Sequence, residues 1–124
     1  MNARIMLMIA LGGALGALAR YGIAGFLPVY RDFPVGTLIV NSMASLLLGY
    51  LYGLLFFGGG VSSDMRAFFG TGFCGALSTF STFSYETFEL LRDREYDLGF
   101  LNISANVIIT ISLVFLGFIL ARRV

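Results

Sequence analysis

Two phenylalanines stand three positions apart in a run that reads Ser-Thr-Phe-Ser-Thr-Phe-Ser over residues 78–84. The edge of an aromatic ring carries partial positive charge, so a small anion can lie against the edges of Phe80 and Phe83. The hydroxyl groups of Ser81, Thr82 and Ser84 can donate hydrogen bonds to the same anion. Two phenylalanines at this spacing are also common in hydrophobic cores, and the spacing alone leaves both interpretations open.

A second set of small and polar residues recurs at every fourth position, which places them on one face of a helix. This face comprises Thr37, Asn41, Ser45, Gly49 and Gly53. The Asn41 amide has two donors that need partners away from water, so Asn41 is a candidate for contact with an ion. Ser45, Gly49 and Gly53 are small enough to predict a close helix–helix contact instead.

Further polar residues follow in the second half of the chain. Glu86 is an acidic residue within an apolar stretch, where a carboxylate is usually functional; at a membrane surface it could instead pair with Arg20 or Arg92. Asn102 and Asn106 stand four positions apart, and Thr110 continues their line. Hydrogen bonds between packed helices are the simplest explanation of that line, and contact with an ion is the alternative.

The overall composition is that of a membrane protein. Of the 124 residues, 58% are apolar and 12% are charged, about half the charge of an ordinary soluble domain. The chain contains no histidine and one cysteine, Cys74, which argues against a zinc site and a disulfide framework and favours a small buried side chain at Cys74. A net charge of +1 argues against a nucleic-acid partner.

Four apolar stretches are long enough to cross a bilayer, which takes roughly 20 residues. They cover about residues 5–27, 35–57, 65–91 and 98–120, and runs rich in Gly, Pro, Asp and Arg separate them. The sequence therefore predicts an all-α membrane protein, with residues 1–124 forming one domain of four transmembrane helices. The first stretch could alternatively be a signal peptide, but Gly12 and Gly16 in a GxxxG pattern favour a retained, packed helix.

The third stretch is a poor candidate for an uninterrupted helix. Three glycines, at positions 70, 72 and 75, precede the hydroxyl-rich run. We expect this helix to be broken near its middle, at about residues 75–79. Backbone carbonyls freed there could bind a cation such as sodium. The alternative is a continuous, glycine-rich helix packed tightly on its neighbours.

The arginines give almost no preference for one orientation in the membrane. With four spans, Arg4, Arg66, Arg122 and Arg123 share the side of the termini, and the other side holds Arg31, Arg92 and Arg94, with Arg20 close to it. Cytoplasmic loops normally carry an excess of Arg and Lys. A chain without such an excess can insert both ways, so we expect dual topology and an antiparallel homodimer.

Three motifs together resemble the small dual-topology fluoride channels of the Fluc or CrcB family. The first is Gly13-Ala14-Leu15-Gly16-Ala17-Leu18-Ala19-Arg20-Tyr21, and the second is Gly36-Thr37-Leu38-Ile39-Val40-Asn41. The third is Gly70-Thr71-Gly72-Phe73-Cys74-Gly75-Ala76-Leu77-Ser78-Thr79-Phe80-Ser81-Thr82-Phe83-Ser84-Tyr85-Glu86. The resemblance covers most of the chain; the fourth stretch is similar mainly at Asn106. The family often has Thr where this chain has Ser78.

The resemblance implies a channel, not an enzyme, that exports fluoride passively and confers fluoride resistance through two pores per antiparallel dimer. It places Asn41, Phe80 and Phe83 along the ion path and Arg20 near the aqueous entrance. Ser81, Thr82, Ser84 and Glu86 lie in the same motif with less defined roles. It also implies a structural sodium ion at the dimer centre, bound by the backbone carbonyls of Gly75 and Ser78.

The partners implied are fluoride, a second copy of the chain and the lipid bilayer, with a bacterial inner (plasma) membrane as the expected location. The main rival is a proton-coupled small multidrug transporter, which also uses four short helices and depends on a carboxylate deep in its first helix. Residues 5–27 contain no acidic residue, which counts against that class. A structural subunit without transport activity would not need polar stripes on three stretches.

Overall fold

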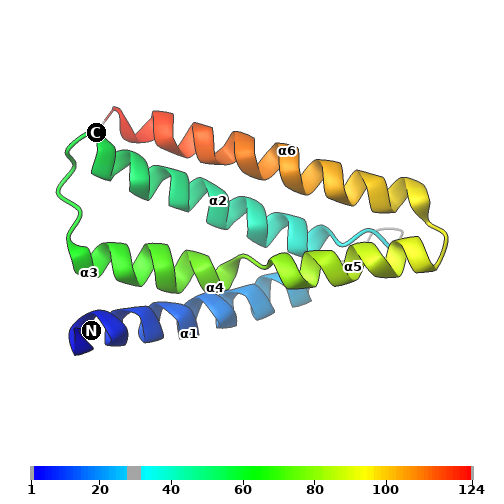
Figure 1. Ribbon diagram of the computed structural model, residues 1–124, viewed down its shortest axis with the longest axis horizontal. Helices are drawn as coiled ribbons and strands as arrows, with labels where there is room; N and C mark the ends of the chain where they lie inside the picture. Colours follow the sequence, from blue (N-terminus) through cyan, green and yellow to red (C-terminus); the bar gives the residue numbers. More distant parts are fainter. Residues whose placement is uncertain (1, 28–31, 124) are drawn as a thin grey trace.

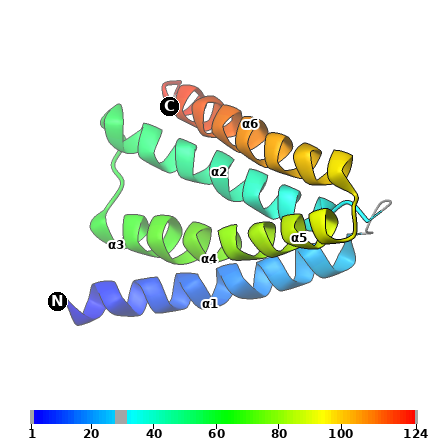
Figure 2. The same ribbon diagram turned by 45° about the vertical axis from the view of Figure 1, so that its right-hand side comes forward.

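The computed structural model describes residues 2–27 and 32–123, and its regular secondary structure is helical. Arg31 and its neighbours 28–30 lie outside the described residues. The long elements run side by side, and both termini lie at the same end of the bundle (Figures 1 and 2). This end also holds the loop between the second and third stretches, as expected for a chain that crosses the membrane four times.

Three helices are long and apolar enough to cross a membrane. They are α1 (Ala3–Phe26), α2 (Val35–Phe56) and α6 (Tyr96–Ala121). At 1.5 Å per residue each exceeds the roughly 30 Å of a hydrocarbon core. The first, second and fourth predicted spans are therefore confirmed as helices, and the chain is a multi-pass membrane protein.

The third stretch consists of shorter elements that continue one another along the bundle. They are α3 (Ser63–Met65), the π-helix η1 (Arg66–Cys74), α4 (Gly75–Leu77) and α5 (Phe80–Arg92). Ser78 and Thr79 between α4 and α5 have extended backbone, with ψ values of 157° and 118°. The π-helical turns were not expected from the sequence, and the divided stretch has no segment as long as the three spans.

Glycines allow the helices to approach one another closely. A methyl group added at Gly12 or Gly16 would collide with the carbonyl oxygens of Phe68 and Phe73 in η1. One added at Gly49 would collide with the Val114 carbonyl of α6. The predicted packing roles of these glycines are confirmed: α1 packs on η1 and α4, and α2 packs on α6.

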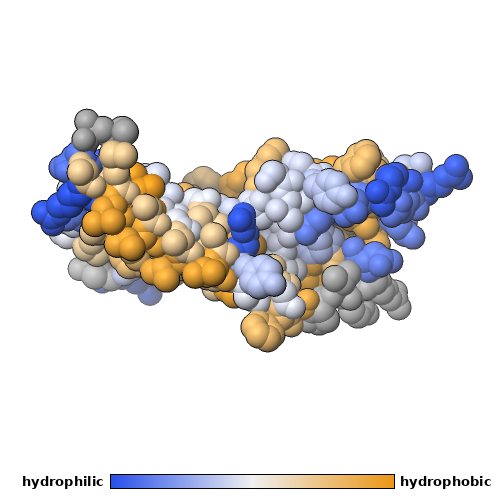
Figure 3. Space-filling model, turned by 90° about the horizontal axis from the view of Figure 1, so that it is seen from below, coloured by the Kyte–Doolittle hydropathy of each residue, from blue (hydrophilic) through white to orange (hydrophobic). Residues whose placement is uncertain are grey.

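The buried interior is small and the apolar exterior is large. Val40, Ala44, Cys74 and Leu77 form the central cluster, which confirms Cys74 as a buried side chain. Large apolar residues along α1 and α6 are exposed. Seen from the α1 side, apolar groups cover much of the half near the N-terminus, and hydrophilic groups gather at both ends (Figure 3). Such a surface suits lipid or another apolar protein surface, not water.

Candidate functional site

The interruption between α4 and α5 is held open by a side chain from another helix. In a continuous helix the Thr79 N–H would donate to the Gly75 carbonyl. Here it donates to Asn41 Oδ1 at 2.7 Å, and Asn41 Nδ2 donates to the Thr79 carbonyl at 3.3 Å. Asn41 thus takes the place of a helical neighbour, and both backbone polar groups of Thr79 have partners although its backbone is extended.

The new helix begins with a side-chain cap. Thr79 Oγ1 accepts from the Thr82 N–H at 3.2 Å, which satisfies one of the free donors at the start of α5. The Thr79 hydroxyl in turn donates to Thr82 Oγ1 at 3.0 Å and lies 3.4 Å from Ser81 Oγ. Ser84 donates to the Phe80 carbonyl. The hydroxyl-rich run therefore serves first to start this helix.

A cavity of about 310 Å³ opens beside the interruption. Its lining comprises Asn41, Ser45, Ser78, Thr79, Phe80, Phe83, Asn106, Val107, Thr110 and Ile111. The rings of Phe80 and Phe83 have centroids 5.5 Å apart and planes inclined at 53°. Phe83 is buried, whereas Phe80 is 80% exposed. The cavity therefore combines ring edges with amide and hydroxyl groups, and a single chain leaves it open beside Phe80.

Buried asparagines continue from the cavity into α6. Asn41 Nδ2 donates to Asn106 Oδ1 at 3.0 Å, and Asn106 Nδ2 donates to Asn102 Oδ1 at 2.9 Å. Asn102 donates to the hydroxyl of Thr87 on α5. The predicted hydrogen bonds between packed helices are thus confirmed for Asn102 and Asn106, whereas Thr110 donates to the Asn106 carbonyl of its own helix. The line of bonds reaches three helices.

A second cavity, of about 450 Å³, lies at the end away from the termini. Among its lining residues are five acidic ones: Asp32, Glu86, Glu89, Asp93 and Glu95. Glu86 Oε1 accepts from the Thr37 hydroxyl at 2.7 Å, and its buried Oε2 has no hydrogen-bond partner among the described residues. Glu86 therefore does not form the ion pair with Arg92 that the sequence left open.

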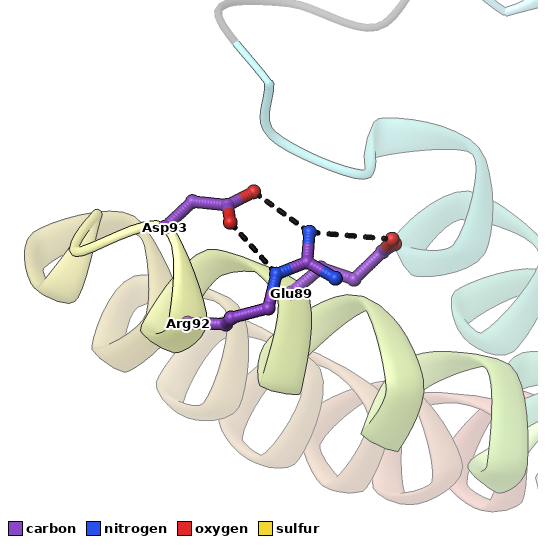
Figure 4. Close-up of polar contacts among 3 residues, drawn as sticks. All are labelled: Glu89, Arg92 and Asp93. Carbon is purple, nitrogen blue, oxygen red and sulfur yellow. Dashed lines mark hydrogen bonds and ion pairs between the residues drawn. The ribbon is translucent and has the colours of Figure 1, made fainter.

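Arg92 binds other carboxylates at this end (Figure 4). Its Nε lies 2.8 Å from Asp93 Oδ1, its second donor lies 3.0 Å from Oδ2, and Glu89 is 3.9 Å away. The guanidinium lowers the pKa of the exposed Asp93, and the same bonds raise the pKa of Arg92. Arg92 and Asp93 are exposed to solvent, so their ion pair contributes little to stability.

Comparison with known proteins identifies the family of this chain. The family described as CrcB-like protein, Camphor Resistance (CrcB), matches residues 7–118. The chain belongs to the CrcB family. It is 78% identical to the "Fluoride-specific ion channel FluC" of Thermococcus onnurineus over 123 residues, 99% of this chain and 100% of that protein.

Two further CrcB-family relatives carry the same name. The protein of Thermococcus kodakarensis is 76% identical over 99% of this chain and 100% of its own length, and that of Methanocaldococcus jannaschii is 45% identical over 98% and 97%. These organisms are archaea, so the relatives give no support to the bacterial inner membrane expected from the sequence.

The structure brings together part of the site expected for a CrcB-family chain. Asn41, Ser78, Phe80 and Phe83 line one cavity. Glu86 lies in the lining of the acidic cavity instead. Ser81, Thr82 and Ser84 lie on α5 beside the first cavity, without lining it, and Gly75 lies in α4 on the other side of the interruption. Arg20 is a half-buried residue of α1 that lines neither cavity.

Thr79 and Asn106 are two site residues that sequence reasoning did not assign to the site. Thr79 contributes its backbone to Asn41, and Asn106 lines the same cavity. The signal for Thr79 was present, because Thr is a preferred N-cap residue and Thr82 follows it by three positions. The role of Asn106 could not be found locally, since its partner Asn41 stands 65 positions earlier.

Proposed function

We propose that this CrcB-family chain is a channel, not an enzyme, and that it conducts fluoride passively across the membrane. The observation that carries the proposal is the 78% identity, over 99% of the chain, to a protein named as a fluoride-specific ion channel. The cavity at Phe80, Phe83 and Asn41 supports it, because its chemistry suits a small anion.

Fluoride gives up hydration on entering a narrow pore, and the pore must replace it. The edges of Phe80 and Phe83 provide weak, positively polarised C–H groups, and Ser81 and Thr82, which stand between them in the sequence, carry hydroxyls that can donate. Both Asn41 donors already have protein acceptors, so Asn41 meets fluoride only if one of these bonds opens. We infer that Asn41 acts mainly by fixing the backbone of Thr79 beside the path.

The path needs a second copy of the chain. Phe80 is 80% exposed, and a ring pair open to lipid cannot enclose an anion. The near balance of arginines between the two ends supports opposite insertion of the two copies. We infer an antiparallel homodimer with two fluoride paths, in which four helical stretches of each copy span the membrane, including the interrupted one.

A sodium ion at the centre of this dimer fits the residues present. Among residues 2–27 and 32–123 no group of three His, Cys, Asp or Glu residues is placed to hold a metal, so backbone oxygens are the candidate ligands. The Gly75 carbonyl lacks its helical donor because Asn41 accepts the Thr79 N–H, and Ser78 has extended backbone. Carbonyls of Gly75 and Ser78 from two copies would hold the ion. When bound, it supplies fixed positive charge.

The proton-coupled multidrug transporter is the alternative class. Such a transporter would need a carboxylate within its first helix, whereas α1 (Ala3–Phe26) contains none.

Purified protein in liposomes loaded with fluoride tests the proposal. A fluoride electrode should record rapid efflux once an ionophore removes the opposing voltage, and protein-free liposomes are the control. Absence of fluoride efflux from a folded, reconstituted protein would overturn the proposal. Uptake of a cationic drug driven by a proton gradient would favour the alternative.

A further inference from the structure

The line of hydrogen bonds behind the Phe80 cavity has a direction, and this direction fixes how the Asn41 amide is turned. Asn41 Oδ1 faces the Thr79 N–H at 2.7 Å, and its Nδ2 faces Asn106 Oδ1 at 3.0 Å. Turning the amide by half a rotation would set donor against donor at Thr79 and acceptor against acceptor at Asn106. Only one orientation of Asn41 satisfies both neighbours.

The orientation of Asn106 is set in the same manner. Its Nδ2 lies 3.0 Å from the Asn102 carbonyl and 2.9 Å from Asn102 Oδ1, two groups that can only accept. Its Oδ1 is therefore the atom that faces Asn41. Without Asn106, the Asn41 Nδ2 would keep only its longer bond, of 3.3 Å, to the Thr79 carbonyl.

The line begins at Thr87 on α5 and ends at Thr79, the residue that caps the start of the same helix. Thr87 directs its hydroxyl proton to the Phe83 carbonyl at 2.8 Å, so its oxygen accepts from Asn102 Nδ2 at 3.0 Å. Asn102 is fully buried and Asn106 nearly so, so a lost hydrogen-bond partner is costly at either residue. The bonds thus run from Phe83 through α6 and α2 to the backbone of Thr79.

We propose that Asn106, oriented by Asn102, is a positioning residue for ion selectivity, which it determines through Asn41 and Thr79 and without touching the ion. The inference rests on the proposed function, because the selectivity concerned is that of the fluoride path. This role explains why α6 carries two buried asparagines, Asn102 (0% exposed) and Asn106 (6% exposed), at positions where a membrane helix would otherwise favour apolar side chains.

The test is a double-mutant cycle read as the ratio of fluoride to chloride efflux rates from liposomes. This ratio does not depend on how many channels are folded. Asn106→Leu, of similar volume, should lower it by about tenfold in the wild-type background. In an Asn41→Ala background the same substitution should change it by less than about twofold, since Asn106 acts through Asn41.

Ser112→Ala, an exposed hydroxyl of α6 away from the line, is the matched control and should keep the wild-type ratio. If Asn106→Leu does not fold, Asn106→Ser decides, because its short side chain cannot reach Asn41. An unchanged ratio in the folded Asn106 variant, or an equal drop in both backgrounds, would overturn the inference. Loss of fluoride efflux from the wild type would instead overturn the proposed function.

Discussion

The inner face of α5, formed by Phe83, Thr87 and Leu90, is buried against its own chain, whereas its outer face, formed by Ser81, Ser84, Tyr85 and Phe88, is exposed. On the inner face the Thr87 hydroxyl both donates and accepts a hydrogen bond within its own chain. Phe80, in the first turn, remains 80% exposed over an open cavity. A single chain thus completes the buried hydrogen bonds of Thr87 and leaves the ring pair of Phe80 and Phe83 open, which is the reason to expect a second copy.

The largest loss of fluoride efflux should come from a substitution of Asn41, which joins the buried hydrogen bonds to the interruption between α4 and α5. Asn41→Asp keeps an acceptor for the Thr79 N–H but loses both donated bonds and adds a buried charge. We expect fluoride efflux to fall by about a hundredfold or more, which corresponds to the cost of an uncompensated buried charge. Ser42→Ala, on the next residue of α2, is the control; efflux of Asn41→Asp within a few-fold of wild type would contradict the account.

Phe80→Ile tests the exposed ring that lines the open cavity. The substitution removes a ring edge from the path while its exposure means that few contacts within the chain are lost. We expect fluoride efflux to fall by about tenfold with little change in the thermal stability of the single chain. Phe88→Ile, an exposed phenylalanine of the same helix outside the cavity, should conduct normally. Equal efflux by the two variants would remove Phe80 from the path.

Gly16→Ala tests whether the close packing of α1 on η1 stabilises the fold that holds α5. The added methyl group meets the Phe73 carbonyl of η1, so the two elements must separate, at a cost of about 1–3 kcal/mol in unfolding free energy. Gly13→Ala is a matched control, because a methyl group there has no neighbour within 4 Å. Thermal unfolding in detergent should show a lower midpoint for Gly16→Ala alone; equal midpoints would mean that α1 and η1 pack loosely.

The smallest effect is expected at the hydrated end, where Arg92 binds Asp93. Because the pKa of Asp93 is lowered in the folded chain, its contribution is present above the ordinary Asp pKa and lost as pH falls through the folded value. Asp93→Asn should therefore be nearly indistinguishable from wild type in thermal stability near neutral pH. It should also lose slightly less stability on acidification. A large difference at neutral pH would show that this surface pair is structurally important.

The lengths of three helices could be predicted because apolar runs of bilayer length are bounded by Gly, Pro and charged residues. The expected span at residues 35–57 became α2 (Val35–Phe56), one residue shorter. The packing roles of Gly12, Gly16 and Gly49 followed from their spacing for the same reason: small residues at one helix face permit close approach.

The details of the third stretch could not be predicted, because their causes lie elsewhere in the chain. The extended backbone at Thr79 depends on Asn41, which stands 38 positions earlier. Asn41 was expected to offer its donors to an ion, but both have acceptors in the protein, and one of them, Asn106, belongs to the last helix. Nine residues of π-helix in η1 also have no local signature beyond their glycines.

Whether oppositely inserted copies exist in one membrane tests the account most directly. Gly60→Cys in a Cys74→Ala background places a single thiol in the exposed loop at the end of the termini, without changing any charge. A membrane-impermeant thiol reagent added to intact vesicles should label about half of the chains, and all of them after the membrane is opened. Labelling of all chains, or of none, before the membrane is opened would show one fixed orientation and contradict the antiparallel dimer.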